Sequence, residues 1–372
     1  MPYYRSQVAS GGQYTQADID SYYIECEGVK YLPDLYLFAN NATLNSPINI
    51  GNNVAQCYYM LSGCTNFNQP INIPASVKNF TGMLRACTNF NQPLTMQEGV
   101  LSCGSLLSSC VNFNQPINIP ASVISLSAMF SECSAFNQPV IIPDNAETMS
   151  SMFKNCKNMN SPVHLGNNVR GLHNMFQFCT NFNQPVNIPE SANNCFAMFS
   201  NCDSFNQPVN IPDNVLSCMY MFSYCPDLNQ PIKIGNSVTT CYSMFSECTS
   251  FNQAINIPNS VINCQAMFSG CTSLNQPIII GENVVDCGRM FKNCQDFSSD
   301  VYFKGTTDRN LPVSALFNNC NSFLVKNIHF NSALQSHFYN ALIGIGAFTN
   351  MTDGNGFYNA YNNVYCYNNY AG

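Results

Sequence analysis

Charged side chains are scarce in this sequence of 372 residues, at 9% of the total, against about 25% in ordinary soluble domains. Lysine and arginine supply 13 residues and aspartate and glutamate 20, which gives a formal net charge of −7. Because no basic stripe runs along the chain, nucleic acid is not an expected partner. Hydrophobic residues make up 46%, so the chain is still expected to fold around a core.

Long hydrophobic runs are also missing. No segment approaches the run of about 18 apolar residues that a membrane-spanning helix needs, so no membrane insertion is expected. The first twenty residues, MPYYRSQVASGGQYTQADID, contain no apolar stretch typical of a signal peptide. We therefore expect the chain to be made and folded in a cytoplasm, and to act outside only after lysis or assembly into a particle.

Motifs of catalytic, cofactor and metal sites are absent from the sequence as well. It has no Gly-x-Ser-x-Gly, no phosphate-binding glycine loop, no His-Glu-x-x-His and no paired Cys-x-x-Cys. The repeat pattern places no two carboxylates together for general acid–base catalysis. The four histidines are dispersed along the chain: His164, His173, His329 and His337. We expect a protein that is not an enzyme, with no cofactor and no metal.

Cysteine, in contrast, is abundant, and most cysteines occupy fixed positions of a sequence repeat. A cysteine recurs every 23 residues from Cys64 to Cys294, and Asn41 stands where the series would begin. Cys320 closes the series after one unit of 26 residues. A fixed period of this length is the signature of a solenoid, in which stacked units bury a core that one unit alone cannot bury.

Each unit, counted from its cysteine as position 1, follows one pattern. Position 4 is a large apolar residue, and positions 5 to 7 read Asn-Gln-Pro in most units. Positions 8 and 10 are aliphatic and position 9 is usually polar, which is typical of a short strand with one buried face. Apolar residues at positions 14, 17, 20 and 21 favour a short helix or 3₁₀ turn. The prediction is an α/β repeat solenoid with one parallel strand per coil, in which a helical or irregular segment returns the chain to the next strand.

The cysteines are predicted to be buried thiols rather than disulfides. Twelve of the 21 occupy position 1, and seven more occupy position 17. Other units place Phe80, Leu126, Met149 or Leu172 at position 17, so this is an apolar core position. A free cysteine behaves there as a small hydrophobe. Such a core fits folding in a reducing compartment.

Three regions follow from the register. Residues 1–40 are expected to form an N-terminal arm and cap, residues 41–320 a solenoid of about 12 coils, and residues 321–372 a C-terminal cap or attachment region. Residues 22–38 are predicted to form a hairpin or a degenerate coil, because an open sheet end presents unpaired backbone groups. Residues 332–343 are predicted to form an amphipathic helix.

Position 9 is the best candidate for binding, because it faces outward along the predicted sheet. Its asparagines recur, and amides that hydrogen-bond one another along the sheet would explain them without a ligand. His164, Lys233 and Tyr302 break that run, so they are the stronger candidates for recognition. The regular Asn and Gln at positions 5 and 6 are expected to satisfy backbone groups at the corner. The candidate asparagines at position 9 are Asn118, Asn187, Asn210 and Asn256.

The C-terminal end of the chain is rich in Tyr, Asn and Gly. Tyr361 and Tyr365 belong to a set of aromatic residues that could stack on sugar rings or on a partner. The alternative is a cap whose aromatic residues close the core. The two roles are compatible.

The repeat phrase C-x-x-F-N-Q-P-(I/V)-x-I-(P/G), followed by M-F-x-x-C, resembles the BspA-like leucine-rich repeats of bacterial surface proteins. It covers about residues 41–320. The resemblance implies a leucine-rich-repeat fold, binding through the sheet face, and attachment to host proteins, to other bacteria or to surfaces. Relatives of this kind are usually exported and anchored to cells, whereas this sequence shows no export signal.

These observations together predict a recognition or attachment protein. The adhesin-like repeat, the missing export signal and the Tyr/Asn/Gly-rich end favour a phage virion component, such as a tail or head fibre. Its expected partners are a protein or glycan on a host surface, and other virion proteins or a second copy through the terminal regions. A bacterial cell-surface adhesin and an intracellular protein-interaction scaffold are the alternatives.

Overall fold

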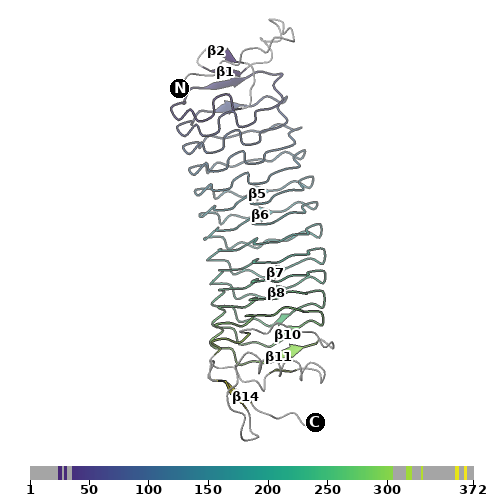
Figure 1. Ribbon diagram of the computed structural model, residues 1–372. Helices are drawn as coiled ribbons and strands as arrows, with labels where there is room; N and C mark the ends of the chain where they lie inside the picture. The colour runs from purple at the N-terminus through teal and green to yellow at the C-terminus, as the bar shows by residue number, and fades with distance from the viewer. Residues whose placement is uncertain are drawn as a thin grey trace. The chain divides into compact units, whose positions relative to one another are not determined.

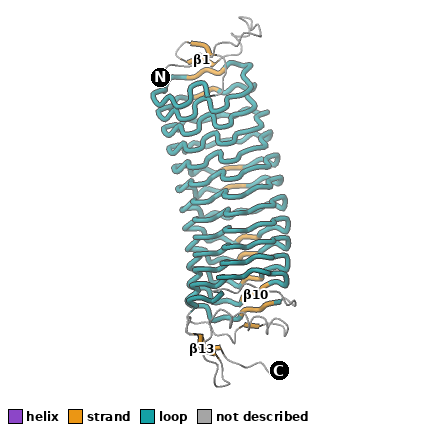
Figure 2. Tube along the Cα trace, in the orientation of Figure 1, coloured by secondary structure: helices purple, strands orange, loops and turns teal. Residues whose placement is uncertain are grey.

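The computed structural model describes residues 24–26, 29–31, 36–304, 316–320, 328–329, 357–359 and 364–366 (Figure 1). The chain forms two compact units, Met1–Val169 and Arg170–Gly372. In the described ranges the backbone consists of short strands joined by loops and turns, and no helix is present (Figure 2). That part of the chain therefore contains no helix able to cross a membrane.

In the first unit an antiparallel hairpin precedes the coils. β1 (Ile24–Cys26) pairs with β2 (Val29–Tyr31) on one side and with β3 (Ile48–Ile50) on the other. Of the two forms predicted for residues 22–38, the structure has the hairpin, which covers the edge of β3. The remaining strands of this unit pair in parallel, β3 with β4 (Ile71–Asn72) and β5 (Val140–Ile141) with β6 (Val163–His164).

In the second unit the parallel strands form two separate sheets. β7 (Val209–Asn210) pairs with β8 (Ile232–Lys233). A four-stranded parallel sheet has the order β12-β11-β10-β9 and contains β9 (Ile255–Asn256), β10 (Ile278–Ile280), β11 (Val301–Phe303) and β12 (Ile328–His329). Near the C-terminus, β13 (Phe357–Asn359) pairs antiparallel with β14 (Val364–Cys366). The helix predicted over residues 332–343 lies outside the described residues.

The predicted fold class, a leucine-rich-repeat type of solenoid with one parallel strand per coil, is confirmed. Neighbouring strands pair residues that are 23 apart, as in Asn49 with Asn72 and Asn210 with Lys233. A second parallel ladder runs along position 16, where single-residue bridges join Asn194 to Ser217 and Ser217 to Thr240. Strand pairing and these bridges thus join coils at two separate places.

Of the two forms predicted for the return of each coil, the helical one is wrong and the irregular one is present, because the described returns consist of turns. Wherever the structure describes them, positions 19 and 23 have positive φ, as at Tyr220 (φ 56) and Tyr224 (φ 59). A left-handed residue ends a right-handed helix. The amide of Tyr220 donates to the Tyr242 carbonyl of the next coil, 2.9 Å away, while Ser223 N–H closes a turn onto the Tyr220 carbonyl. Because alternate amides bond between coils, the i to i−4 ladder of a helix cannot form.

Stacked phenylalanine rings fill the core of both units. In the first, Phe90, Phe113 and Phe136 from three successive coils stack with centroids 6.0 Å apart. In the second, Phe199 stacks on Phe205 of the following corner at 4.3 Å and on Phe222 of the next coil at 5.6 Å. All of these rings are fully buried. Position 4 therefore forms a stack of four rings in the first unit, from Phe67 to Phe136. Position 21 forms a stack of rings in the second unit, from Phe176 to Phe291.

All cysteines in the described part of the chain whose burial is given are buried free thiols, as predicted. The position 1 thiols do more than fill space, because they donate to a backbone carbonyl at position 21, two coils earlier in the chain. Cys87 Sγ lies 3.1 Å from the Leu61 oxygen, and Cys225 Sγ lies 3.0 Å from the Phe199 oxygen. This bond needs a small donor, which explains why position 1 stays cysteine while position 17 accepts Leu, Met or Phe.

The amides at position 5 form the corner network that the sequence predicts. Asn183 Oδ1 accepts hydrogen bonds from the Asn206 backbone amide and from Gln207 Nε2, each at 2.9 Å. Asn206 Oδ1 in turn accepts the Asn229 backbone amide at 2.9 Å. Each corner asparagine therefore satisfies a backbone donor of the next coil immediately before its strand.

Candidate recognition site

The side chains at position 9 face solvent in both units, while their neighbours at positions 8 and 10 are buried, except for the half-buried Ile117 and Leu165. Val163 is buried and His164 exposed in β6, and Ile232 is buried and Lys233 exposed in β8. Ile279 is half-buried. The first unit presents Asn49, Asn72, Thr95, Asn118, Ile141 and His164 in this way, and the second presents Asn187, Asn210, Lys233, Asn256, Ile279 and Tyr302.

Amide stacking does not account for the asparagines at position 9. In the described residues the hydrogen-bonded amide ladder runs along the corners, through residues such as Asn45 and Asn68. Asn49 and Asn72 lie opposite each other in the strand register, yet no hydrogen bond joins their side chains in this part of the chain. The amides at position 9 are left to face solvent.

One coil of the second unit departs from the repeat on its outward face. Position 7 is Asp300, where ten other coils have proline and one has alanine. Position 11 is Lys304, where all other coils but one have proline or glycine. Successive side chains of a strand point to opposite faces, so these two residues share the outward face with Tyr302 at position 9. Val301 and Phe303 between them are buried.

His329 on the neighbouring strand completes this group. β12 pairs with β11 in parallel and places His329 beside Tyr302. Their rings stack with centroids 4.5 Å apart and planes 13° apart. His329 Nε2 donates to Asp300 Oδ1 at 3.0 Å, and the Tyr302 hydroxyl donates to Asp300 Oδ2 at 3.4 Å. One carboxylate thus orients both rings.

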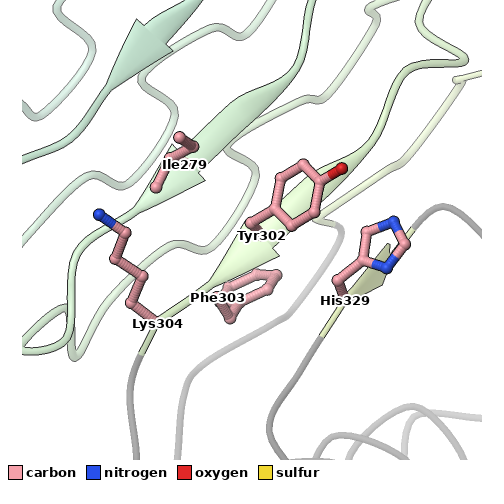
Figure 3. A pocket seen from close by; sticks show the side chains of 5 residues that line it. All are labelled: Ile279, Tyr302, Phe303, Lys304 and His329. Carbon is pink, nitrogen blue, oxygen red and sulfur yellow. The ribbon is translucent and has the colours of Figure 1, made fainter.

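The stacked rings border an open depression of about 430 Å³ on the sheet face. We call it the Tyr302 depression; Ile279, Tyr302, Phe303, Lys304 and His329 line it (Figure 3). Tyr302 is 39% exposed, and in Figure 3 its ring lies between Ile279 and His329. The Lys304 ammonium forms no ion pair with any described residue. The depression therefore offers two rings, an aliphatic side chain and one positive charge.

A second depression, of about 460 Å³, lies on the sheet face of the first unit. It has Asn118 in its lining, together with Leu94, Thr95 and Met96 of the preceding coil and the prolines of the corners. It offers no charged side chain. Its chemistry is therefore less distinctive than that of the Tyr302 depression.

The predicted site residues do not form one cluster. Of the second unit's candidates, Tyr302 lines the depression, while Lys233 and three asparagines (Asn187, Asn210 and Asn256) lie on earlier coils. His164 and Asn118 belong to the first unit. Tyr361 lies outside the described residues, and Tyr365 is described only by its backbone, which pairs with Tyr358 between β14 and β13.

Sequence reasoning missed Asp300, Lys304 and His329. Comparing positions 7 and 11 between coils would have revealed the first two. His329 was missed because one extra residue follows Cys320, so that counting from this cysteine places Ile328, and not His329, at position 9. The strand register instead pairs His329 with Tyr302. The apolar–polar alternation of Ile328 and His329 was the available signal.

The described residues include no cluster of three or more histidines, cysteines or carboxylates that could hold a metal ion. The thiols in the described core are also poor nucleophiles. Burial raises the pKa of Cys241 and of Cys248 to about 12, and the thiolate is the reactive form.

Comparison with known proteins links the chain to a family. The family model described as "Mycoplasma protein of unknown function, DUF285" matches in five overlapping segments, residues 25–118, 97–187, 143–234, 193–304 and 235–332. These segments include the whole of the repeat. No curated protein matches the chain.

Three solved structures are similar to the chain at low identity. A leucine rich cell surface protein from Faecalibacterium prausnitzii is 18% identical, with a TM-score of 0.37 over 71% of this chain and 86% of that one. A leucine-rich repeat protein from Bacteroides ovatus is 16% identical, with a TM-score of 0.36 over 69% and 87%. The pneumococcal vaccine antigen PcpA is 11% identical, with a TM-score of 0.44 over 80% and 91%.

Proposed function

This chain belongs to the family described as "Mycoplasma protein of unknown function, DUF285", and we propose that it is a non-enzymatic recognition protein. It binds a protein or glycan partner through the sheet face of its coils. The Tyr302 depression is the main contact of the second unit, and Lys233 with the exposed asparagines extends the same face.

The observation that carries this proposal is the coil that holds Asp300, Tyr302 and Lys304. Residues that stack the coils must recur from coil to coil, as the cysteines, phenylalanines and corner asparagines do. The three outward residues of this coil do not recur, and the buried Val301 and Phe303 between them keep the repeat pattern. Exposed positions that depart from the pattern while the core keeps it are free to serve a contact with another molecule.

A binding role suits these groups better than a catalytic one. Asp300 and His329 form a carboxylate–histidine pair, but the third member of the group is a tyrosine whose hydroxyl donates to the same carboxylate. A general base needs a substrate proton or a nucleophile within hydrogen-bonding reach. Here both partners of Asp300 are ring groups of the protein, and the result is an oriented surface.

Sedimentation of the purified full chain with envelopes of the producing cell tests the recognition function. We expect Tyr302→Ala to lower the bound fraction by at least about threefold, because a central aromatic contact dominates interfaces of this kind. Leu216→Ala is the matched control, since Leu216 is 53% exposed at position 15 of a coil in the same unit. Equal binding by wild type and both variants would refute the role of the sheet face.

For the setting, we propose a phage virion fibre that meets the host surface, on the grounds of the adhesin-like repeat and the Tyr/Asn/Gly-rich C-terminal end, which is suited to assembly. A bacterial cell-surface adhesin is the second candidate, favoured by the resemblance to BspA-like repeats. Proteomics of gradient-purified particles, envelopes and cytosol separates the two. Enrichment in particles supports the fibre, enrichment in envelopes supports the adhesin, and a signal confined to cytosol contradicts both.

A further inference from the structure

We propose that the Tyr302 depression binds an aromatic side chain of a protein partner, next to a carboxylate that pairs with Lys304. This inference rests on the proposed recognition function and specifies its ligand.

The rings are oriented before any ligand arrives. Asp300 accepts hydrogen bonds from both Tyr302 and His329, and the two rings stack 4.5 Å apart. The exposed fractions of the His329 and Asp300 side chains are only 32% and 43%. A surface held in its binding geometry loses little conformational entropy when a ligand binds, so this pair is suited to a rigid, flat group.

The polar atoms at the ring edges bond within the protein. The Tyr302 hydroxyl and His329 Nε2 both donate to Asp300, so the rings present mainly their carbon surfaces, beside Ile279. A neutral sugar is bound by several directed polar groups as well as by a ring face. An aromatic side chain requires only ring contacts in stacked or edge-to-face geometry. The depression therefore favours an aromatic residue of a protein over a neutral glycan.

The positive charge at the edge specifies what lies next to the aromatic group. Lys304 lines the depression (Figure 3), and no described residue forms an ion pair with it. Both carboxylate oxygens of Asp300 accept hydrogen bonds from the ring groups, so Lys304 remains available to a partner's charge. A carboxylate of the partner, one residue away from its aromatic side chain, would complement the charge of Lys304. The volume of about 430 Å³ lies within the usual range of pockets for small ligands and large side chains.

The absence of tryptophan from this chain makes a direct test possible, because an indole probe can be followed without background from the protein. The probes are acetyl-Gly-Ser-Trp-Asp-Ser-Gly-amide and the matched peptide with asparagine in place of aspartate. Fluorescence anisotropy of each peptide is titrated with the full chain. We expect the aspartate peptide to bind about two- to fivefold more tightly, the range of an exposed ion pair.

Three variants assign the contacts. Lys304→Gln should lower the affinity of the aspartate peptide to that of the asparagine peptide, and Tyr302→Ala should weaken both peptides. Lys157→Gln, an exposed lysine of the first unit, is the charge-matched control and should change neither. Thermal unfolding of every variant establishes that it is folded.

The outcomes separate this inference from the function on which it rests. Equal affinity of the two peptides, or displacement of either by methyl β-galactoside, would overturn the proposed ligand class. If neither peptide binds while Tyr302→Ala still weakens attachment to envelopes, the ligand class is wrong and the recognition function stands. If both assays fail, both proposals fall.

Discussion

His329 Nε2 donates a hydrogen bond to Asp300 Oδ1 over 3.0 Å, although the two residues are 29 apart in the chain. The bond joins β12 to the corner before β11, after a coil that is longer than the others. It also brings the only histidine ring described on this part of the sheet face against Tyr302. Asp300 therefore acts as a positioning residue for the two rings.

Asp300→Ala is predicted to weaken binding without unfolding the protein. The variant removes the acceptor of both ring groups, so the rings lose their fixed orientation, and we expect the affinity for the tryptophan–aspartate peptide to fall about threefold. Because the Asp300 side chain is 43% exposed, the free energy of unfolding should change by less than about 0.5 kcal/mol. Asp300→Asn keeps one acceptor oxygen, so its affinity for the peptide should lie between the affinities of wild type and Asp300→Ala.

Cys225→Ala is predicted to destabilise the protein more than Cys241→Ala. Both thiols are fully buried, so each substitution loses a similar amount of packing. Only Cys225 donates to a backbone carbonyl, that of Phe199 at 3.0 Å, and the loss of such a bond costs about 1 kcal/mol. Urea unfolding followed by circular dichroism measures the difference, and equal midpoints would show that the thiol bond contributes nothing.

Stability is predicted to fall as the pH rises above 9. Burial raises the pKa of Cys241 and of Cys248 from 9.0 to about 12. Below pH 9 the thiols are protonated in both states. Above it the unfolded chain releases protons that the folded chain retains, so the free energy of unfolding decreases until the folded pKa is reached. Urea midpoints across this range measure the effect, and a midpoint independent of pH would contradict it.

Two asparagines of one coil are predicted to differ in their effect on stability. Asn206→Ala removes the acceptor for the Asn229 backbone amide, which should cost about 1 kcal/mol, the net contribution of an ordinary hydrogen bond. Asn206→Asp keeps an acceptor and should cost less. Asn210 is exposed in β7, so Asn210→Ala should change stability by less than about 0.5 kcal/mol. Thermal denaturation of the three variants tests the contrast.

The strand half of the coil could be predicted from sequence because its signals are local. Alternation at positions 8 to 10 indicates the buried and exposed faces, and proline or glycine marks the end of the strand in most coils. The structural role of the corner amides could be predicted because the same Asn and Gln recur at positions 5 and 6 of most coils, whereas a specific binding site would not recur in this way. The inward direction of the thiols followed from the apolar residues that replace them at position 17.

The return half could not be predicted in the same way. Its left-handed positions are occupied by residues such as Ala197 (φ 50) and Tyr220 (φ 56), whereas sequence rules expect glycine or asparagine there. The conformation is stabilised by amides that donate to the next coil, a contact between residues far apart in sequence. The position of His329 was hidden for a related reason, since strand pairing rather than cysteine spacing determines it.

The alternation within each strand separates two kinds of information along the chain. Positions 8 and 10 determine how a coil stacks, whereas positions 7, 9 and 11 of the coil from Cys294 determine the chemistry of the exposed surface. A new surface chemistry can therefore arise from three point substitutions in any one coil, with no insertion and no change in register. A gene built by duplication of one unit would diversify in this way, one coil at a time.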